Sequence, residues 1–133
     1  MKVVNLDGNP SNWKIRGSIV TLDNRTRSKY HILARQLLKE RYPTITIVEE
    51  VPISVFHNNT LFLDFYIQIH QIAIEVHGEQ HFKYTPHFHG NRMGFLSSQR
   101  NDTHKQLWCE TNNIQLIILP YNKNEDEWRI KLE

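Results

Sequence analysis

The chain has 133 residues, of which 39% are hydrophobic and 23% are charged. This composition is typical of one folded domain with an ordinary apolar core, and it excludes a chain that is disordered throughout. The formal net charge of +2 gives no overall electrostatic argument for a nucleic-acid partner, and the single cysteine, Cys109, excludes an internal disulfide bond and a zinc site built from several cysteines.

No apolar run approaches the roughly 18 residues that a transmembrane helix needs, and the first residues lack the apolar region of a secretion signal. We therefore expect a cytosolic protein with no membrane partner. Residues 1–24 contain several Asn, Asp and Gly and are expected to form an N-terminal arm or a small extension, with one short strand near 18–22. Residues 25–133 are expected to form a single domain.

A helix is predicted from Ser28, a good N-cap residue, to Tyr42, because Pro43 cannot continue it. One apolar stripe follows the helical repeat at Leu33, Leu37 and Leu38. The next segment, 44–48, is β-branched throughout and predicts a strand that continues to Ile53.

Two further strands are predicted at 61–68 and 71–77, with a tight turn at Ile69 and His70 between them. Residues 57–60 are turn-like because their asparagines tolerate positive φ. The three strands are therefore expected to form an antiparallel meander.

Residues 78–95 contain one proline and several glycines and are predicted to be a long loop, of the kind that is often functional. A second helix is predicted to begin at Ser97 or Ser98, either of which is a good N-cap residue, and to end near Thr111.

Residues 114–119 are predicted to be a buried strand, and Leu107 and Trp108 are expected in the core. Asn124, with Glu127 three positions later, resembles a capping box that opens a short terminal helix. The expected order is α-β-β-β-α-β-α, with a helical crossover that allows the last two strands to be parallel. The predicted fold class is an α/β sandwich around a central mixed four-stranded sheet flanked by helices.

Two acids interrupt strands that are otherwise apolar, Asp64 in 61–68 and Glu75 in 71–77. If Gln68 pairs with Gln71, Asp64 lies opposite Glu75, and directly opposed residues share one face of a sheet. Two buried carboxylates repel each other, and a divalent cation such as Mg²⁺ or Mn²⁺ removes that cost. The alternative is that both acids lie on the solvated face of a half-exposed sheet.

His77 follows Glu75 by two positions and so shares its side of the sheet, His81 is expected just past the end of that strand, and Asp102 lies early in the second predicted helix. A histidine near a metal-bound phosphate positions water, acts as a general base or protonates a leaving group. The alternatives are ordinary polar residues at a strand end, and, for Asp102, a first-turn acid favoured by the helix dipole.

Basic residues are unevenly distributed, and the candidates for contacting a phosphate backbone are Arg25, Arg27, Lys29 and Arg100. The alternative for such a run of charges is a solvated helix face.

These motifs resemble the PD-(D/E)xK nuclease superfamily, in which an acid on one strand is followed by Glu-x-Lys on its neighbour. Asp64 and the segment Glu75-Val76-His77 look like that pattern, with His in the place of Lys. The chain is more similar to the very short patch repair endonuclease branch and its relatives, the EDxHD homing endonucleases, over residues 28–122.

That branch carries an Asp on one apolar strand, a second apolar strand that runs into a Gly, then a His, and then a helix with an Asp. Here these look like Asp64, His77-Gly78, His81 and Asp102. The resemblance implies a restriction-endonuclease-like fold. It also implies a DNA endonuclease or nickase that hydrolyses phosphodiester bonds with Mg²⁺ or Mn²⁺, with DNA as partner, as a monomer or a homodimer.

The resemblance further implies a role for each residue. Asp64 would hold the metal with help from Glu75 and the backbone carbonyl of Val76. His81 would be the general base or the residue that positions water, oriented by Asp102 as a carboxylate orients a histidine.

His77 would contact the scissile phosphate or a metal-bound water. Two departures from the pattern stand beside it. The acid that relatives carry early in the first helix is replaced here by Tyr30 or His31, and Lys83 is the nearest substitute for the missing lysine. The missing acid of the first helix favours the alternative of a catalytically inactive DNA- or protein-binding module. A metal-dependent RNA nuclease is a third alternative, which the sequence leaves open.

Overall fold

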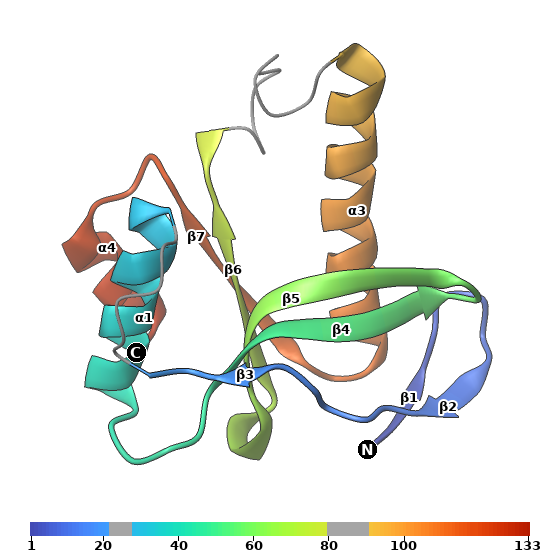
Figure 1. Ribbon diagram of the computed structural model, residues 1–133, viewed down its shortest axis with the longest axis horizontal. Helices are drawn as coiled ribbons and strands as arrows, with labels where there is room; N and C mark the ends of the chain where they lie inside the picture. Colours follow the sequence, from blue (N-terminus) through green and yellow to red (C-terminus); the bar gives the residue numbers. More distant parts are fainter. Residues whose placement is uncertain (22–27, 80–90) are drawn as a thin grey trace.

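A mixed five-stranded sheet forms the centre of the described residues, which are 1–21, 28–79 and 91–133 of this computed structural model. The strand order is β3-β4-β5-β6-β7 (Figure 1). The strands of this sheet are β3 Ser18–Ile19, β4 Val48–Phe56, β5 Asn59–Ile67, β6 Ile72–His77 and β7 Gln115–Pro120. The α-helices of the described residues are α1 Lys29–Arg41, α3 Arg92–Thr111 and α4 Glu125–Lys131.

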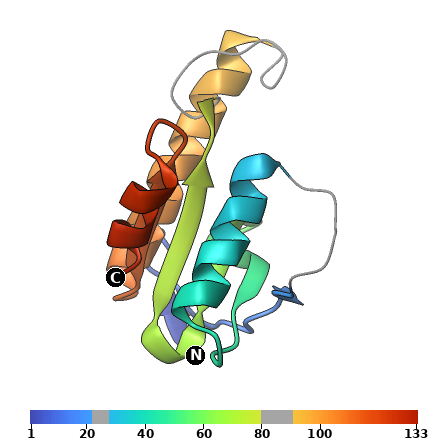
Figure 2. The same cartoon turned by 90° about the vertical axis from the view of Figure 1, so that its left-hand side faces the viewer.

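Two apolar clusters place the helices on opposite faces of the sheet. On one face, Leu38 of α1 and Trp128 of α4 pack in the same buried cluster as Ile74 of β6, which we call the α1-side cluster. On the other face, Trp108 of α3 packs with Tyr66 of β5 in a second cluster, the α3-side cluster. Figure 2 shows α1 and α4 on the near side, flanking β6, with α3 behind. The predicted α/β class, with helices flanking a mixed sheet, is confirmed.

The strand connections follow the predicted order. β4, β5 and β6 form an antiparallel meander, and β7 returns through α3 to pair in parallel with β6. The sheet of the described residues has one strand more than the four predicted, because β3 pairs antiparallel with β4 at the edge of the sheet. Gly17 permits this approach, since its φ is +140° and a Cβ there would lie 2.5 Å from the carbonyl oxygen of Glu49.

The first strand of the meander is shifted from its prediction at 44–53. It begins only at Val48 and runs on to Phe56. Ile45 and Ile47 instead pack into the cluster beneath α1, so burial rather than strand pairing accounts for these two β-branched side chains, whereas Thr44 and Thr46 are exposed. The predicted turn at 57–60 is tighter, because Asn58, with φ +62°, reverses the chain and β5 begins at Asn59.

The predicted register between β5 and β6 is confirmed. Their connection is a single turn of 3₁₀ helix, η1 Gln68–His70, followed by Gln71 with φ +52°. The paired residues include Phe65 with Ile74 and Ile67 with Ile72. Continued by one position, this register places Asp64 across from Glu75.

α3 begins earlier than its predicted start at Ser97 or Ser98. The side chain of Asn91 caps the helix by accepting a hydrogen bond of 2.8 Å from the amide of Gly94, so the end of the predicted loop 78–95 is helical. Trp108 is fully buried as predicted, but Leu107 is 44% exposed and the core prediction for it is wrong.

The capping box predicted at Asn124 and Glu127 is confirmed at the start of α4. No helix in the described ranges has both the length and the apolar character to cross a membrane.

The N-terminal residues complete the core beneath α3. A hairpin of β1 Lys2–Val4 and β2 Pro10–Asn12 carries Val3 and leads to Trp13, and both side chains are buried in the α3-side cluster. The side chain of Asn112, at the end of α3, accepts from the amide of Val4 at 2.7 Å and donates to its carbonyl at 2.9 Å. Residues 1–13 are therefore packed against α3.

Candidate functional site

The two acids singled out in the sequence join β5 to β6 where the backbone pairing of the two strands ends. The amide of Asp64 donates a hydrogen bond of 2.7 Å to Oε2 of Glu75, and the amide of Val76 donates one of 2.8 Å to Oδ2 of Asp64. Each carboxylate thus accepts from the backbone of the opposite strand. The two carboxylates thus provide acceptors for half-buried backbone amides.

Asp64 lies where the side chains of the β4–β5 ribbon change from one face of the sheet to the other. Leu63 packs in the α3-side cluster, whereas Phe65, two positions on, packs in the α1-side cluster. Residues two apart in a regular strand share a face, so β5 changes face at Asp64. Glu50, which the flanking pairs place opposite Asp64, has φ +55°, and this left-handed residue turns β4 at the same level.

Lys105 of α3 forms an ion pair with Glu75. Its Nζ donates to Oε1 of Glu75 at 2.7 Å, and the Glu75 side chain is only 2% exposed. Both oxygens of Glu75 therefore have hydrogen-bond donors. Burial lowers the pKa of Lys105, but the carboxylate of Glu75 outweighs it, and the pKa is raised above its ordinary value.

The burial of Asp64 is compensated by fewer hydrogen-bond donors than the burial of Glu75. Burial and the neighbouring charge of Glu75 raise the pKa of Asp64 to about 7, although the hydrogen bond from Val76 and the charge of Lys105 oppose the shift. At neutral pH one lysine thus faces two carboxylates, one of which resists ionisation. A further cation beside Asp64 favours the ionised form of that carboxylate.

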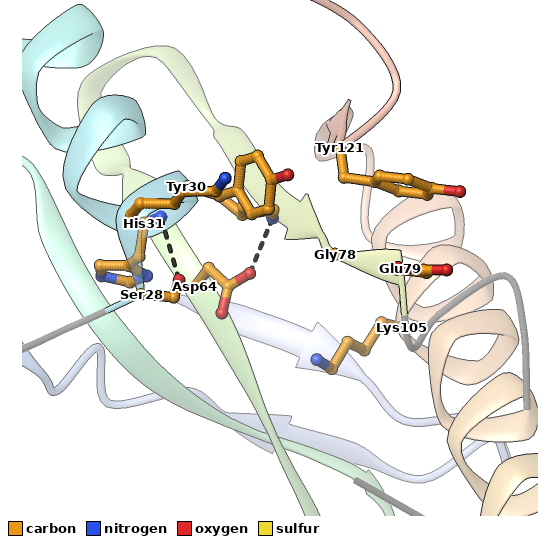
Figure 3. A pocket seen from close by; sticks show the side chains of 10 residues that line it. Ser28, Tyr30, His31, Asp64, Gly78, Glu79, Lys105 and Tyr121 are labelled. Carbon is orange, nitrogen blue, oxygen red and sulfur yellow. Dashed lines mark hydrogen bonds between the residues drawn. The ribbon is translucent and has the colours of Figure 1, made fainter. Parts of the chain in front are cut away.

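Asp64 opens into a pocket of about 450 Å³ (Figure 3). The pocket lies among the N-terminal turn of α1, the ends of β6 and β7, and α3. Its lining residues are Ser28, Lys29, Tyr30, His31, Asp64, Val76, Gly78, Glu79, Lys105 and Tyr121. The predicted site residues Asp64, Val76 and Lys29 therefore share one cavity, with Glu75 buried directly behind it.

His77 and Asp102 are brought together beside Glu75. Nε2 of His77 lies 4.0 Å from Oδ1 of Asp102, and one ligand atom each of Glu75, His77 and Asp102 lies within 4.8 Å of the others. The described neighbour of Asp102 is thus His77, whereas the sequence analysis paired Asp102 with His81. His81 lies outside the described residues.

The candidate phosphate contacts are spread over different places. Lys29 lines the pocket, with its Nζ 5.0 Å from the centre of the Tyr30 ring. Arg100 is an exposed residue of α3 and is not among the residues that line the pocket. Arg25 and Arg27 lie outside the described residues.

Lys105 is the site residue that sequence reasoning missed. Lys105 follows Asp102 by three positions on the same helix, and residues at that spacing share a helix face. The signal in the sequence was an acid, Asp102, three positions before the lysine on the same predicted helix. Tyr121 gave no comparable signal, because it enters the pocket only through the position of β7.

A second buried acid, Glu49 of β4, contacts two side chains from the first turns of α1 behind the pocket. Arg35 donates to both of its oxygens, at 2.7 and 3.1 Å, and Nε2 of His31 lies 2.9 Å from Oε2. Although burial raises it, the pKa of Glu49 is held below its ordinary value by these partners. Both oxygens of Glu49 therefore already accept hydrogen bonds from Arg35.

The chain is similar to uncharacterized proteins of three viruses. It is 39% identical over 64 residues to uncharacterized protein 307L of Invertebrate iridescent virus 6, an alignment that covers 48% of this chain and 32% of that protein. It is 35% identical over 66 residues to uncharacterized protein 094L of Frog virus 3, covering 49% of this chain and 43% of that protein.

The third relative is uncharacterized protein 033L of Invertebrate iridescent virus 3, which is 30% identical over 63 residues that cover 47% of this chain and 32% of the relative. The chain thus spans less than half the length of the curated relatives it matches. No family model matches the chain. No solved structure matches it either.

Proposed function

We propose that this protein is a metal-dependent DNA endonuclease or nickase with a restriction-endonuclease-like fold. One observation carries the proposal: Asp64 and Glu75 face each other where β5 and β6 cease to pair, beside a pocket that also holds Lys105. A mixed sheet with helices on both faces supports the fold assignment.

The donor set fits a hard divalent cation. Asp64 and Val76 both line the pocket, and carboxylate and carbonyl oxygens are the ligands that Mg²⁺ and Mn²⁺ prefer. The raised pKa of Asp64, caused by burial and by Glu75, marks a position where added positive charge is favourable. When bound, such an ion supplies Lewis-acid activation of the phosphate and a more acidic water.

The side chains of this chain would bind and orient the substrate around the acid pair. Lys105 and Lys29 line the pocket and would neutralise phosphate oxygens. His77, held beside Asp102, would donate to the phosphate or to a water at the edge of the site. His81 is proposed as the general base or the residue that positions water, on the basis of its place in the motif.

One observation favours the alternative of an inactive DNA- or protein-binding module. Glu75 already has a donor on each oxygen, from Lys105 and from the amide of Asp64, so its burial is compensated without a metal. The first turn of α1 also places Tyr30 and His31, rather than an acid, in the pocket. A metal-dependent RNA nuclease uses the same chemistry on a different backbone.

A nicking assay tests the proposal directly. Supercoiled plasmid DNA and a structured RNA are incubated with the protein in Mg²⁺, in Mn²⁺ and in EDTA. We expect relaxed DNA only with metal, and no product from Asp64→Asn. Asp126→Asn is the matched control, because Asp126 is an exposed acid of α4 with a side chain that is 87% exposed.

Cleavage of RNA alone would identify the RNA nuclease, and binding without cleavage would identify the inactive module. Full activity of Asp64→Asn, or activity in EDTA, would remove the basis of the proposal.

A further inference from the structure

Two tyrosines from different elements line the pocket that contains Asp64. Tyr30 belongs to the first turn of α1, and Tyr121 directly follows β7. Figure 3 shows the two rings along one edge of the pocket and Lys105 on the opposite side. The pocket thus has aromatic rings along one edge, with Nζ of Lys29 5.0 Å from the centre of the Tyr30 ring, and a second lysine on the opposite side.

Each tyrosine has a contact outside the pocket. The Tyr30 ring packs 6.4 Å from the Trp128 ring of α4, measured between ring centres. The amide of Tyr121 donates a hydrogen bond of 2.8 Å to the carbonyl of His77, which anchors the Tyr121 backbone beside β6. A ring that is already packed, as that of Tyr30 is, loses little conformational freedom when a ligand stacks on it.

The depth of the acid pair limits the form of a nucleic-acid substrate. Glu75 is 2% exposed, and Asp64 is reached through a pocket of about 450 Å³. A cavity of this size admits a single small-molecule-sized group, whereas the phosphates of a duplex lie on the outside of a wide, stiff helix. A phosphate that reaches Asp64 therefore belongs to a nucleotide that itself enters the pocket.

We infer that the pocket binds one unpaired nucleotide, with its phosphate between Asp64 and Lys105 and its base stacked on Tyr30 or Tyr121. This inference rests on the proposed nuclease function and specifies its substrate as single-stranded, frayed or flipped-out nucleic acid. Aromatic rings beside a positive charge are the usual arrangement for binding unpaired bases, since every base has a face on which to stack.

The test measures base stacking separately from cleavage. A short single-stranded oligonucleotide with one 2-aminopurine, whose fluorescence is quenched by stacking, is titrated with the protein in Ca²⁺ and in EDTA. The same oligonucleotide in a full duplex and an RNA version are the comparison ligands. Cleavage is recorded separately, by incubating each ligand with the protein in Mg²⁺ and running the products on a gel.

We expect quenching with the single strands and much weaker binding of the duplex. Tyr30→Leu and Tyr121→Leu should weaken binding about 5- to 100-fold, the loss that corresponds to one stacked base. Tyr30→Phe and Tyr121→Phe, which keep the rings, should bind like the wild type. Phe62→Leu is the matched control, because Phe62 is an exposed aromatic residue of β5 outside the pocket.

Tyr30 also packs on Trp128, so thermal unfolding of each variant is measured, and Tyr121→Leu decides the outcome if Tyr30→Leu does not fold. Equal affinity for duplex and single strand, or unchanged binding by Tyr121→Leu, would overturn the inference even if DNA is cleaved. Stacking of the single strand without cleavage in Mg²⁺ would support the nucleotide site and reject the nuclease function.

Discussion

Lys105 and Tyr30 line the same pocket although their helices pack on opposite faces of the sheet. A continuous sheet would keep the two side chains apart. They line one pocket because the backbone pairing of β5 with β6 ends at Phe65 and Ile74, and beyond that level Asp64 and Glu75 link the strands through their carboxylates. The position of the pocket follows from this change in strand pairing.

Replacing Lys105 should destabilise the fold strongly. Lys105→Met leaves Glu75 buried without its cation, and removal of one partner from a buried ion pair costs about 3–5 kcal/mol. Urea denaturation measures the change in the free energy of unfolding. Lys123→Met is the control, since Lys123 and Glu127 form an exposed pair that is worth at most about 1 kcal/mol.

The double variant Lys105→Met with Glu75→Gln should recover part of the loss, because no unpaired charge stays buried. Equal destabilisation by Lys105→Met and Lys123→Met would show that Glu75 does not depend on Lys105.

The metal-free protein should become less stable, relative to Asp64→Asn, as the pH rises from about 4 to about 7. Burial and Glu75 raise the pKa of Asp64 from 3.8 to about 7 in the folded state. The folded state then binds more protons than the unfolded state across this range, so stability falls as Asp64 ionises. The difference reaches at most about 4 kcal/mol, at 1.36 kcal/mol per pKa unit.

Denaturation curves of wild type and Asp64→Asn in EDTA at several pH values measure this difference. Parallel pH profiles for the two proteins would contradict the raised pKa.

Mg²⁺ or Mn²⁺ should raise the melting temperature of the wild type at pH 8. An ion that binds only the folded state at a hundredfold excess over its Kd adds about 2.7 kcal/mol of stability. Asp64→Asn should show little of this increase, and Asp126→Asn should show all of it. A rise in melting temperature that is the same in all three proteins would place the ion elsewhere.

Arg35→Met should cost far more stability than Arg129→Met. Arg35 and Glu49 form a buried bidentate pair behind α1, whereas Arg129 binds Glu40 and Glu125 on the surface. We expect a loss of about 3–5 kcal/mol for Arg35→Met and at most about 1 kcal/mol for Arg129→Met.

The pKa of Glu49 is held below its ordinary value, so its contribution to wild-type stability is present at neutral pH and is lost as the pH falls through that lowered pKa. Arg35→Met should lack this acid-side loss. Similar denaturation midpoints for the two arginine variants would show that Glu49 does not rely on Arg35.

Local patterns in the sequence predicted most of the fold. The turn at Ile69 and His70 was enough to fix the β5–β6 register and so to place Asp64 opposite Glu75, because antiparallel pairing follows from counting outwards from a turn. The capping box at Asn124 likewise depends only on residues close in the chain.

Features set by distant parts of the chain were not predictable in this way. The face change at Asp64 depends on Glu50 adopting φ +55°, which no glycine or asparagine signals at that position. Lys105 enters the site because α3 docks against the sheet, and Tyr121 because β7 ends beside His77.

The two acids and Lys105 lie at different separations along the chain. Asp64 and Glu75 are eleven residues apart on one hairpin, whereas Lys105 of α3 follows Glu75 by thirty residues. Closing a short loop costs less entropy, which favours early formation of short-range contacts. We therefore expect the two carboxylates to approach each other before Lys105 reaches them, so that the acid pair gains its counterion only when α3 docks.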